Sequence, residues 1–96
     1  MSEAVIVVDE KDNVATALRP LEEGELLQVH IGGRALDVTV LQPIPFGHKI
    51  ALTDLEKGQP VVKYGEVIGL ATQRIGKGEH THVHNVEGQT GRGDRT

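Results

Sequence analysis

The chain has 96 residues, of which 38% are hydrophobic and 2% aromatic, and its formal net charge is −4. This length suffices for one small domain, and so short a chain needs a second chain or copy to close a deep active site. The dispersed basic residues and the scarcity of aromatic rings argue against nucleic-acid binding. The absence of cysteine excludes disulfides, thiolate metal sites and a cysteine nucleophile.

The N-terminal segment MSEAVIVVDEKDN contains a short apolar run, Ala4 to Val8, with acidic residues on both sides. This run predicts an inner β-strand. Its length and its acidic flanks fit neither a membrane span nor a signal peptide. Together with the lack of cysteine, the segment predicts a soluble cytoplasmic protein that does not associate with a membrane.

The hydrophobic spacing changes in DNVATALRPLEEG, which predicts a short helix through Leu18. Asp12 or Asn13 can cap its start, and Pro20 ends it. A single helical turn is predicted for TDLEKG, residues 53–58, with a threonine or aspartate cap and a glycine stop. The other segments have the pattern of strands, so we expect a mainly β protein with one or two short helices.

The segment ELLQVHIGGRALDVTV predicts a β-hairpin, because its Gly-Gly pair at positions 32–33 can adopt the positive φ angles of a two-residue turn. The predicted cross-strand pairs are Leu27 with Val38, Gln28 with Asp37, Val29 with Leu36 and His30 with Ala35. In this register one face is apolar and the other is polar. His30 falls on the polar face and is most simply a solvated strand residue.

Proline and glycine divide the rest of the chain into short extended segments. Pro43 and Pro45 predict an extended, turning connection into a short strand, with His48 at its entrance. Gly65 predicts a sharp bend between two further short strands. No internal repeat of useful strength is visible. The polar, glycine-rich residues 87–96 predict a flexible tail or a linker.

Three of the five histidines occur in GEHTHVHNVEG, at every second position. In an extended strand, His80, His82 and His84 share one face, with neighbours ~6.6 Å apart and the outer two ~13 Å apart. One divalent metal ion can therefore bind one His-x-His pair, but hardly all three histidines. The additional ligand would come from Glu79, Glu87, His48, His30 or another chain.

Two other interpretations of this histidine run stay open at the level of sequence. Imidazoles near their ordinary pKa could transfer protons at neutral pH without a metal. An exposed polar strand near a terminus could also be rich in histidine without any function.

Several further motifs occur in a fixed order between positions 43 and 85. They are Gly47-His48-Lys49 at the entrance of a strand, a turn ending at Gly58, Pro60 to Tyr64 followed by Gly65-Glu66-Val67-Ile68-Gly69, and Gly78-Glu79-His80 leading to His84-Asn85. In this order and spacing they resemble the SAF domain at the start of altronate and galactarate dehydratases. The opening DNVATALRPLEEGE resembles the N-terminal segment of that family, so the resemblance covers nearly the whole chain to about Val86.

The resemblance implies a small SAF-type β-clip fold, in which short strands form two or three small sheets, for residues 1–86, with residues 87–96 as the tail. In fused relatives this domain precedes a much larger dehydratase domain, and in split relatives it is a separate small subunit. We therefore expect the small subunit of a two-component sugar-acid dehydratase, a carbon-oxygen lyase that is inactive without its large subunit, or of the similar sulfolactate sulfo-lyase. The alternative is a noncatalytic carbohydrate-binding or assembly module of SAF type.

The expected activity gives the histidines a role. Dehydration of a hydroxy acid removes a proton beside a carboxylate and expels hydroxide, and a divalent metal, a base and an acid can each assist. We expect His48 and His82 to be catalytic, and His80, His82 and His84 to supply ligands for Fe²⁺, Mn²⁺ or Mg²⁺. The expected partners are the large dehydratase subunit and a sugar-acid substrate, and exposed sheet edges favour self-association.

Overall fold

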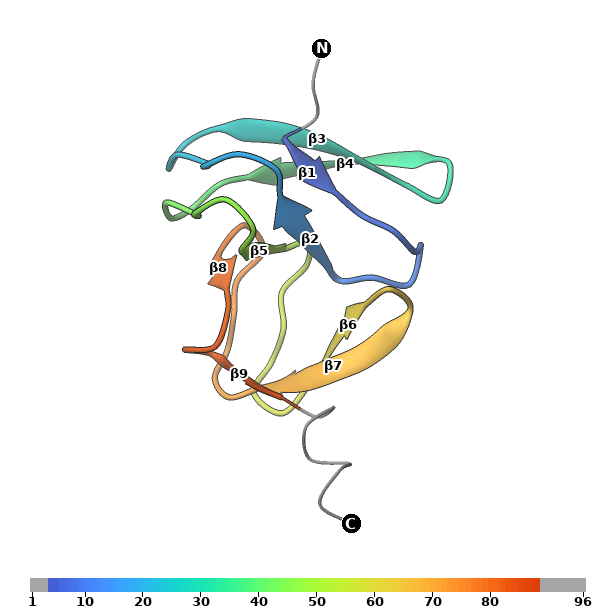
Figure 1. The fold of residues 1–96 in the computed structure, drawn as a ribbon, viewed down its shortest axis with the longest axis vertical. Helices are drawn as coiled ribbons and strands as arrows, with labels where there is room; N and C mark the ends of the chain where they lie inside the picture. Colours follow the sequence, from blue (N-terminus) through green and yellow to red (C-terminus); the bar gives the residue numbers. More distant parts are fainter. Residues whose placement is uncertain (1–3, 89–96) are drawn as a thin grey trace.

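The computed structural model describes residues 4–88, which fold into nine β-strands arranged in three sheets (Figure 1). The strands are β1 (Val5–Ile6), β2 (Val14–Ala17), β3 (Leu26–Ile31), β4 (Arg34–Thr39), β5 (Lys49–Ala51), β6 (Pro60–Lys63), β7 (Glu66–Ala71), β8 (His80–Thr81) and β9 (Val86–Gly88). A four-stranded sheet, in the order β1-β2-β5-β8, lies between the β3-β4 hairpin and the three-stranded sheet β6-β7-β9. All neighbouring strands are antiparallel.

The structure confirms the mainly β class, but the predicted helices are wrong, because residues 4–88 form strands and turns without any helix. The first predicted helix is replaced by β2, which pairs with β1 and β5. Asn13 caps no helix, since its side chain accepts the Val62 N–H at 2.8 Å and donates to the Pro60 carbonyl at 3.0 Å. These two bonds tie the start of β2 to β6.

The hairpin predicted around the glycine pair is confirmed residue by residue. Strands β3 and β4 pair Leu27 with Val38, Gln28 with Asp37, Val29 with Leu36 and His30 with Ala35. The apolar face is largely buried, whereas Gln28, His30 and Asp37 are exposed. His30 therefore lies on the solvated face, as predicted.

Four turns share one build. Each turn starts with an apolar residue that is at most 2% exposed and contains, three positions later, a glycine with φ between 86° and 95°. They are turn 1 (residues 21–25), turn 2 (44–48), turn 3 (55–59) and turn 4 (75–79). Their first residues pair in two isolated bridges, Leu21 with Ile44 and Leu55 with Ile75.

Backbone hydrogen bonds fix how the chain leaves each turn. The N–H of the residue after the glycine donates to the carbonyl three positions earlier, at 2.9–3.2 Å, and the glycine N–H donates to a carbonyl elsewhere in the chain, at 2.7–2.9 Å. Strands β3, β5, β6 and β8 each begin two residues after a turn glycine, so the turns set the starting points of these strands. The segment TDLEKG, predicted as a helical turn, forms most of turn 3 instead.

Alternate residues of the central sheet enter two hydrophobic clusters. Ala15 of β2 and Ile50 of β5 belong to the larger cluster, which includes residues of the β3-β4 hairpin. Val14 and Ala51 belong to the smaller cluster, which includes residues of β6 and β7. Both faces of the central sheet are therefore covered, while β8 forms one of its edges.

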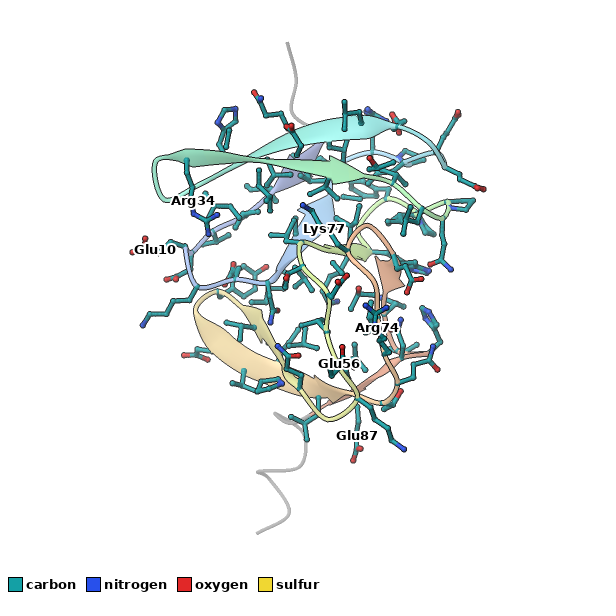
Figure 2. All side chains as sticks on the ribbon, turned by 180° about the vertical axis from the view of Figure 1, so that it is seen from behind. Glu10, Arg34, Glu56, Arg74, Lys77 and Glu87 are labelled. Atoms are coloured by element: carbon teal, nitrogen blue, oxygen red, sulfur yellow. The ribbon has the colours of Figure 1, made fainter. Side chains whose placement is uncertain are left out.

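Arg74 links turns 3 and 4 at the surface. Its guanidinium lies 3.3 Å from Asp54 and 3.4 Å from Glu56, and Figure 2 shows Arg74 close to Glu56 on the back of the molecule. All three side chains are more than half exposed, so the two ion pairs contribute little to stability. The guanidinium is thus engaged by carboxylates of its own chain.

The tail predicted for residues 87–96 overlaps the end of β9, and residues 89–96 lie outside the described part of the chain. The boundary between domain and tail therefore stays a prediction. Between residues 4 and 88, no helix is long and apolar enough to cross a membrane.

We expect Gly78→Ala to destabilise the protein more than Gly24→Ala, although both glycines occupy the same position in their turns. Both have a positive φ, 93° and 95°, which costs an L residue ~1–2 kcal/mol. A Cβ at Gly24 meets no atom within 4 Å, whereas a Cβ at Gly78 overlaps the carbonyl oxygen of Thr39. Chemical denaturation measures the difference, and equal losses for the two variants would contradict it.

Candidate metal centre

Pairing of β5 with the edge strand β8 places two histidines opposite each other. The register sets Ile50 against His80. Continued outward, the same register sets His48, which precedes β5, against His82, which follows β8. The rings of His48 and His82 are stacked, with centroids 3.7 Å apart and an interplanar angle of 11°.

His80 completes a compact group of three imidazoles. Nδ1 of His48 lies 2.8 Å from Nε2 of His80, and the ring centroids of His80 and His82 are 5.8 Å apart. One nitrogen from each of the three rings lies within 4.8 Å of both others. Among the described residues, this is the only group of three or more histidine or carboxylate side chains that could hold a metal ion. The fold therefore joins the His-x-His pair of one segment to the histidine of another.

The extended strand predicted for the histidine run is wrong. Strand β8 comprises only His80 and Thr81, and the chain then turns, with the Asn85 N–H donating to the His82 carbonyl at 3.1 Å. The His84 ring consequently lies 4.9 Å from the His80 ring, in place of the ~13 Å of an extended strand. His84 is exposed and is not one of the three grouped histidines.

A buried asparagine holds this turn. Asn85 is 2% exposed, its Oδ1 accepts the His82 N–H at 2.9 Å, and its Nδ2 donates to the His80 carbonyl at 2.9 Å. Gln42 adds a third bond, because its Oε1 accepts the His80 N–H at 2.9 Å. Asn85 directly follows the histidine run, where a turn residue is expected, but Gln42 carries no local signal and is missed by reasoning from sequence.

The other ligands considered from the sequence have different surroundings. His30 is exposed on the β3-β4 hairpin, and Glu79 Oε1 accepts the Gly76 N–H at 2.9 Å within turn 4. Glu87 lies on β9, in a different sheet. In the part of the chain that the structure describes, the group of three includes none of these side chains.

Burial favours the neutral form of His80 and His82 near pH 7. Loss of solvent is the largest cause that lowers the pKa of His80, to about 4, and repulsion from His84, His48, His82 and Lys49 adds to it. Burial, followed by repulsion from His48, also lowers the pKa of His82. Neutral imidazole is the form that binds a metal, because a protonated ring nitrogen has no lone pair to offer.

Two observations fit a metal ion at this group. Nδ1 of His82 is buried and has no hydrogen-bond partner among residues 4–88. The 2.8 Å between the His48 and His80 nitrogens is close to the ~3 Å that separates adjacent ligands on metal–nitrogen bonds of ~2.1 Å. Three imidazoles suit a first-row metal and leave further coordination positions open.

The fold and the site together define a small β-domain with three histidines at one sheet edge. Comparison with known proteins assigns this domain to a family. The chain matches the family model of the altronate/galactarate dehydratase SAF domain over residues 3–89. It is 42% identical to altronate dehydratase of Bacillus subtilis over 82 residues and 47% identical to altronate dehydratase of Escherichia coli over 75 residues, which cover 85% and 78% of this chain. The chain belongs to the altronate/galactarate dehydratase SAF domain family, as its motifs predicted.

A third relative matches over nearly its whole length. The chain is 40% identical over 90 residues to the (2R)-sulfolactate sulfo-lyase subunit alpha of Chromohalobacter salexigens, covering 91% of this chain and 96% of that subunit. In contrast, the matched part is 16% of the Bacillus subtilis dehydratase and 14% of the Escherichia coli dehydratase. The relatives are thus dehydratases and a lyase subunit by name, and the words subunit alpha indicate an enzyme of more than one subunit.

We expect the metal-free protein to lose stability as the pH falls from about 6.5 to about 4. His80 has its ordinary pKa, near 6.5, in the unfolded chain and a pKa of about 4 in the folded chain. Between these values the unfolded state binds a proton that the folded state does not, so acidification favours unfolding. Denaturation midpoints across this range test the expectation in the wild type and in His80→Asn, which removes this titration and keeps those of the carboxylates. An unchanged pH dependence in the variant would contradict it.

Asn85→Ala should destabilise the protein by ~1–3 kcal/mol, because it leaves the His82 N–H and the His80 carbonyl without their partner. Val83→Ala is the matched control in the same turn, since Val83 is 83% exposed, and it should change the free energy of unfolding by less than ~0.5 kcal/mol. Urea denaturation measures both variants. Similar losses in the two would show that Asn85 does not hold the turn.

Proposed function

We propose that His48, His80 and His82 bind a divalent metal in the active site of a hydroxy-acid lyase, and that a larger chain or domain completes that site. The proposed reaction is the dehydration of a sugar acid of the altronate or galactarate type, with this chain as the small subunit. The observation that carries the proposal is the convergence of three imidazoles from two segments at a sheet edge. The names of the relatives support the reaction class.

In the proposed reaction, three histidines bind the metal and His84 has a different role. Elimination removes a proton beside the substrate carboxylate and expels hydroxide from the next carbon, and both changes place negative charge on oxygen atoms. A divalent cation held by His48, His80 and His82 would stabilise that charge. His84 is exposed and lies 4.9 Å from His80, so its ring is the one in this segment that stays free to exchange a proton with a substrate.

Exposed apolar side chains beside the ligands support a protein partner at this edge. Phe46, two residues before His48, is 66% exposed, and Val83, next to His82, is 83% exposed. Large apolar side chains that border a functional site commonly belong to the core of an interface. A larger chain docked here would cover Phe46 and Val83 and close the site against water. In our proposal, it corresponds to the part of the dehydratases that this chain does not match.

Among the divalent metals expected from the sequence, we favour Fe²⁺. Imidazole nitrogen suits iron, whereas Mg²⁺ and Mn²⁺ are suited by carboxylate, carbonyl and water oxygens. The three grouped donors are all imidazoles. We therefore expect the protein to bind Mg²⁺ more weakly than Fe²⁺.

His82→Ala should weaken Fe²⁺ binding at least ~10-fold relative to the wild type, because it removes one of three ligands. His30→Ala is the matched control, since His30 is exposed on the β3-β4 hairpin, and it should bind as the wild type does. Anaerobic calorimetric titration measures the affinities. Equal affinities of the wild type and His82→Ala would overturn the metal site.

The reaction is tested with this chain and a large dehydratase chain of the same genome, produced together. We expect dehydration of a sugar acid to require both chains and Fe²⁺, and to fall in His82→Ala but not in His30→Ala. Parallel assays with altronate, galactarate and (2R)-sulfolactate separate a dehydratase from a sulfo-lyase. Full activity of the large chain alone would refute the proposed role of this chain.

A further inference from the structure

We propose that Pro45 is a positioning residue for the metal centre. By removing one backbone N–H from turn 2, it releases the His48 side chain from the turn and leaves it free to face His80 and His82. The effect on metal binding rests on the proposed function, whereas the effect on the position of His48 does not. Turns 1, 3 and 4 show what happens at the same position when the N–H is present.

In those three turns, the side chain that follows the glycine closes the turn. A side-chain oxygen of this residue accepts the backbone N–H three positions earlier. The pairs, donor first, are Glu22 and Glu25 at 2.8 Å, Glu56 and Gln59 at 2.9 Å, and Gly76 and Glu79 at 2.9 Å. The same position therefore performs the same task three times, each time with a side chain that ends in an oxygen.

Turn 2 departs from this pattern at both positions of the pair. Pro45 stands where the donor would be, and proline has no N–H, while His48 stands where the acceptor would be. The backbone of the turn is nevertheless kept, since the His48 N–H donates to the Pro45 carbonyl at 3.0 Å, as its equivalents do. The imidazole instead lies 2.8 Å from Nε2 of His80 and is stacked on His82.

A residue other than proline at position 45 would create a conflict. Its N–H would lie in the turn as the N–H groups of Glu22 and Glu56 do, and it would either recruit Nδ1 of His48 or stay without that partner. Position 45 is exposed, so an N–H without a partner there would bond to water, whereas a recruited imidazole loses its contact with His80. Proline removes the donor and so prevents this recruitment.

The neighbouring Pro43 provides a matched control. It directly precedes the buried first residue of turn 2, a position that holds Asp54 in the approach to turn 3 and Arg74 in the approach to turn 4. Proline is therefore not needed there for a turn of this build. Pro43→Ala changes the same residue type in the same loop without adding a donor at position 45.

The position of His48 is tested in the metal-free protein by long-range proton–nitrogen spectra of the imidazole rings. Pro45→Ala should shift the ring nitrogens of His48 and His80, because their contact is lost, while Pro43→Ala leaves both in place. Thermal unfolding of each variant shows whether the fold is kept. Wild-type ring shifts in a folded Pro45→Ala protein would overturn the proposal.

The effect on binding is measured by titrating Fe²⁺ into the same variants. Pro45→Ala should bind Fe²⁺ ~10-fold more weakly than the wild type, as is common when a group that orients a ligand is lost, whereas Pro43→Ala should bind normally. Unchanged affinity in a Pro45→Ala protein whose rings have moved would refute the link to metal binding. If the wild type binds no Fe²⁺, the proposed function fails, and the ring shifts still decide what Pro45 does to His48.

A double-mutant cycle in the metal-free protein isolates the hydrogen bond from a backbone N–H at position 45 to the side chain at position 48. His48→Gln gives turn 2 the acceptor that turn 3 has, but without a donor opposite it. Pro45→Ala combined with His48→Gln supplies both groups. The thermal unfolding midpoint of the double variant should therefore exceed the value obtained by adding the two single effects. Additive effects would mean that the two positions do not interact in turn 2, which would overturn the proposal.

Discussion

The antiparallel pairing of β5 with β8 is the contact on which the candidate site depends. It joins two similar halves, one with turns 1 and 2 around the β3-β4 hairpin and one with turns 3 and 4 around β6 and β7. The register that sets Ile50 against His80 also brings His48 and His82 together. Because side chains alternate along a strand, a slip of one residue would turn His80 to the other face and disperse the group. The candidate site is thus specified by this register.

The four turns show how one backbone unit serves two purposes. Hydrogen bonds between main-chain groups build every turn, so the side chain after the glycine can vary without loss of the turn. In three turns that side chain closes the turn, and in turn 2 it reaches the histidine group. Burial then favours the neutral imidazole at His80, the form that can accept a cation. The group lies at a sheet edge, next in sequence to the exposed apolar side chains of Phe46 and Val83.

Some elements follow from local chemistry and others do not. The β3-β4 hairpin was predictable to the residue, because Gly32 and Gly33 accept the positive φ that a two-residue turn needs and alternation sets the rest. The helix expected through Leu18 fails because Asn13 bonds to the backbone of β6, far away in sequence, and caps no helix. The prediction of an extended histidine strand fails because the buried Asn85, which follows the histidines, hydrogen-bonds back to the backbone of His80 and His82 and turns the chain.

The sequence by itself determined the β class, the hairpin register, the family and the segment rich in histidine, since each depends on residue type and spacing over a short stretch. Only the tertiary structure decided which histidines meet. His48 and His80 are 32 positions apart, and their contact depends on a strand register and on the side chains of Gln42 and Asn85. The contact between His48 and His80 and the bond from Gln42 leave no local pattern, because they join segments that are distant in sequence and that packing alone brings together.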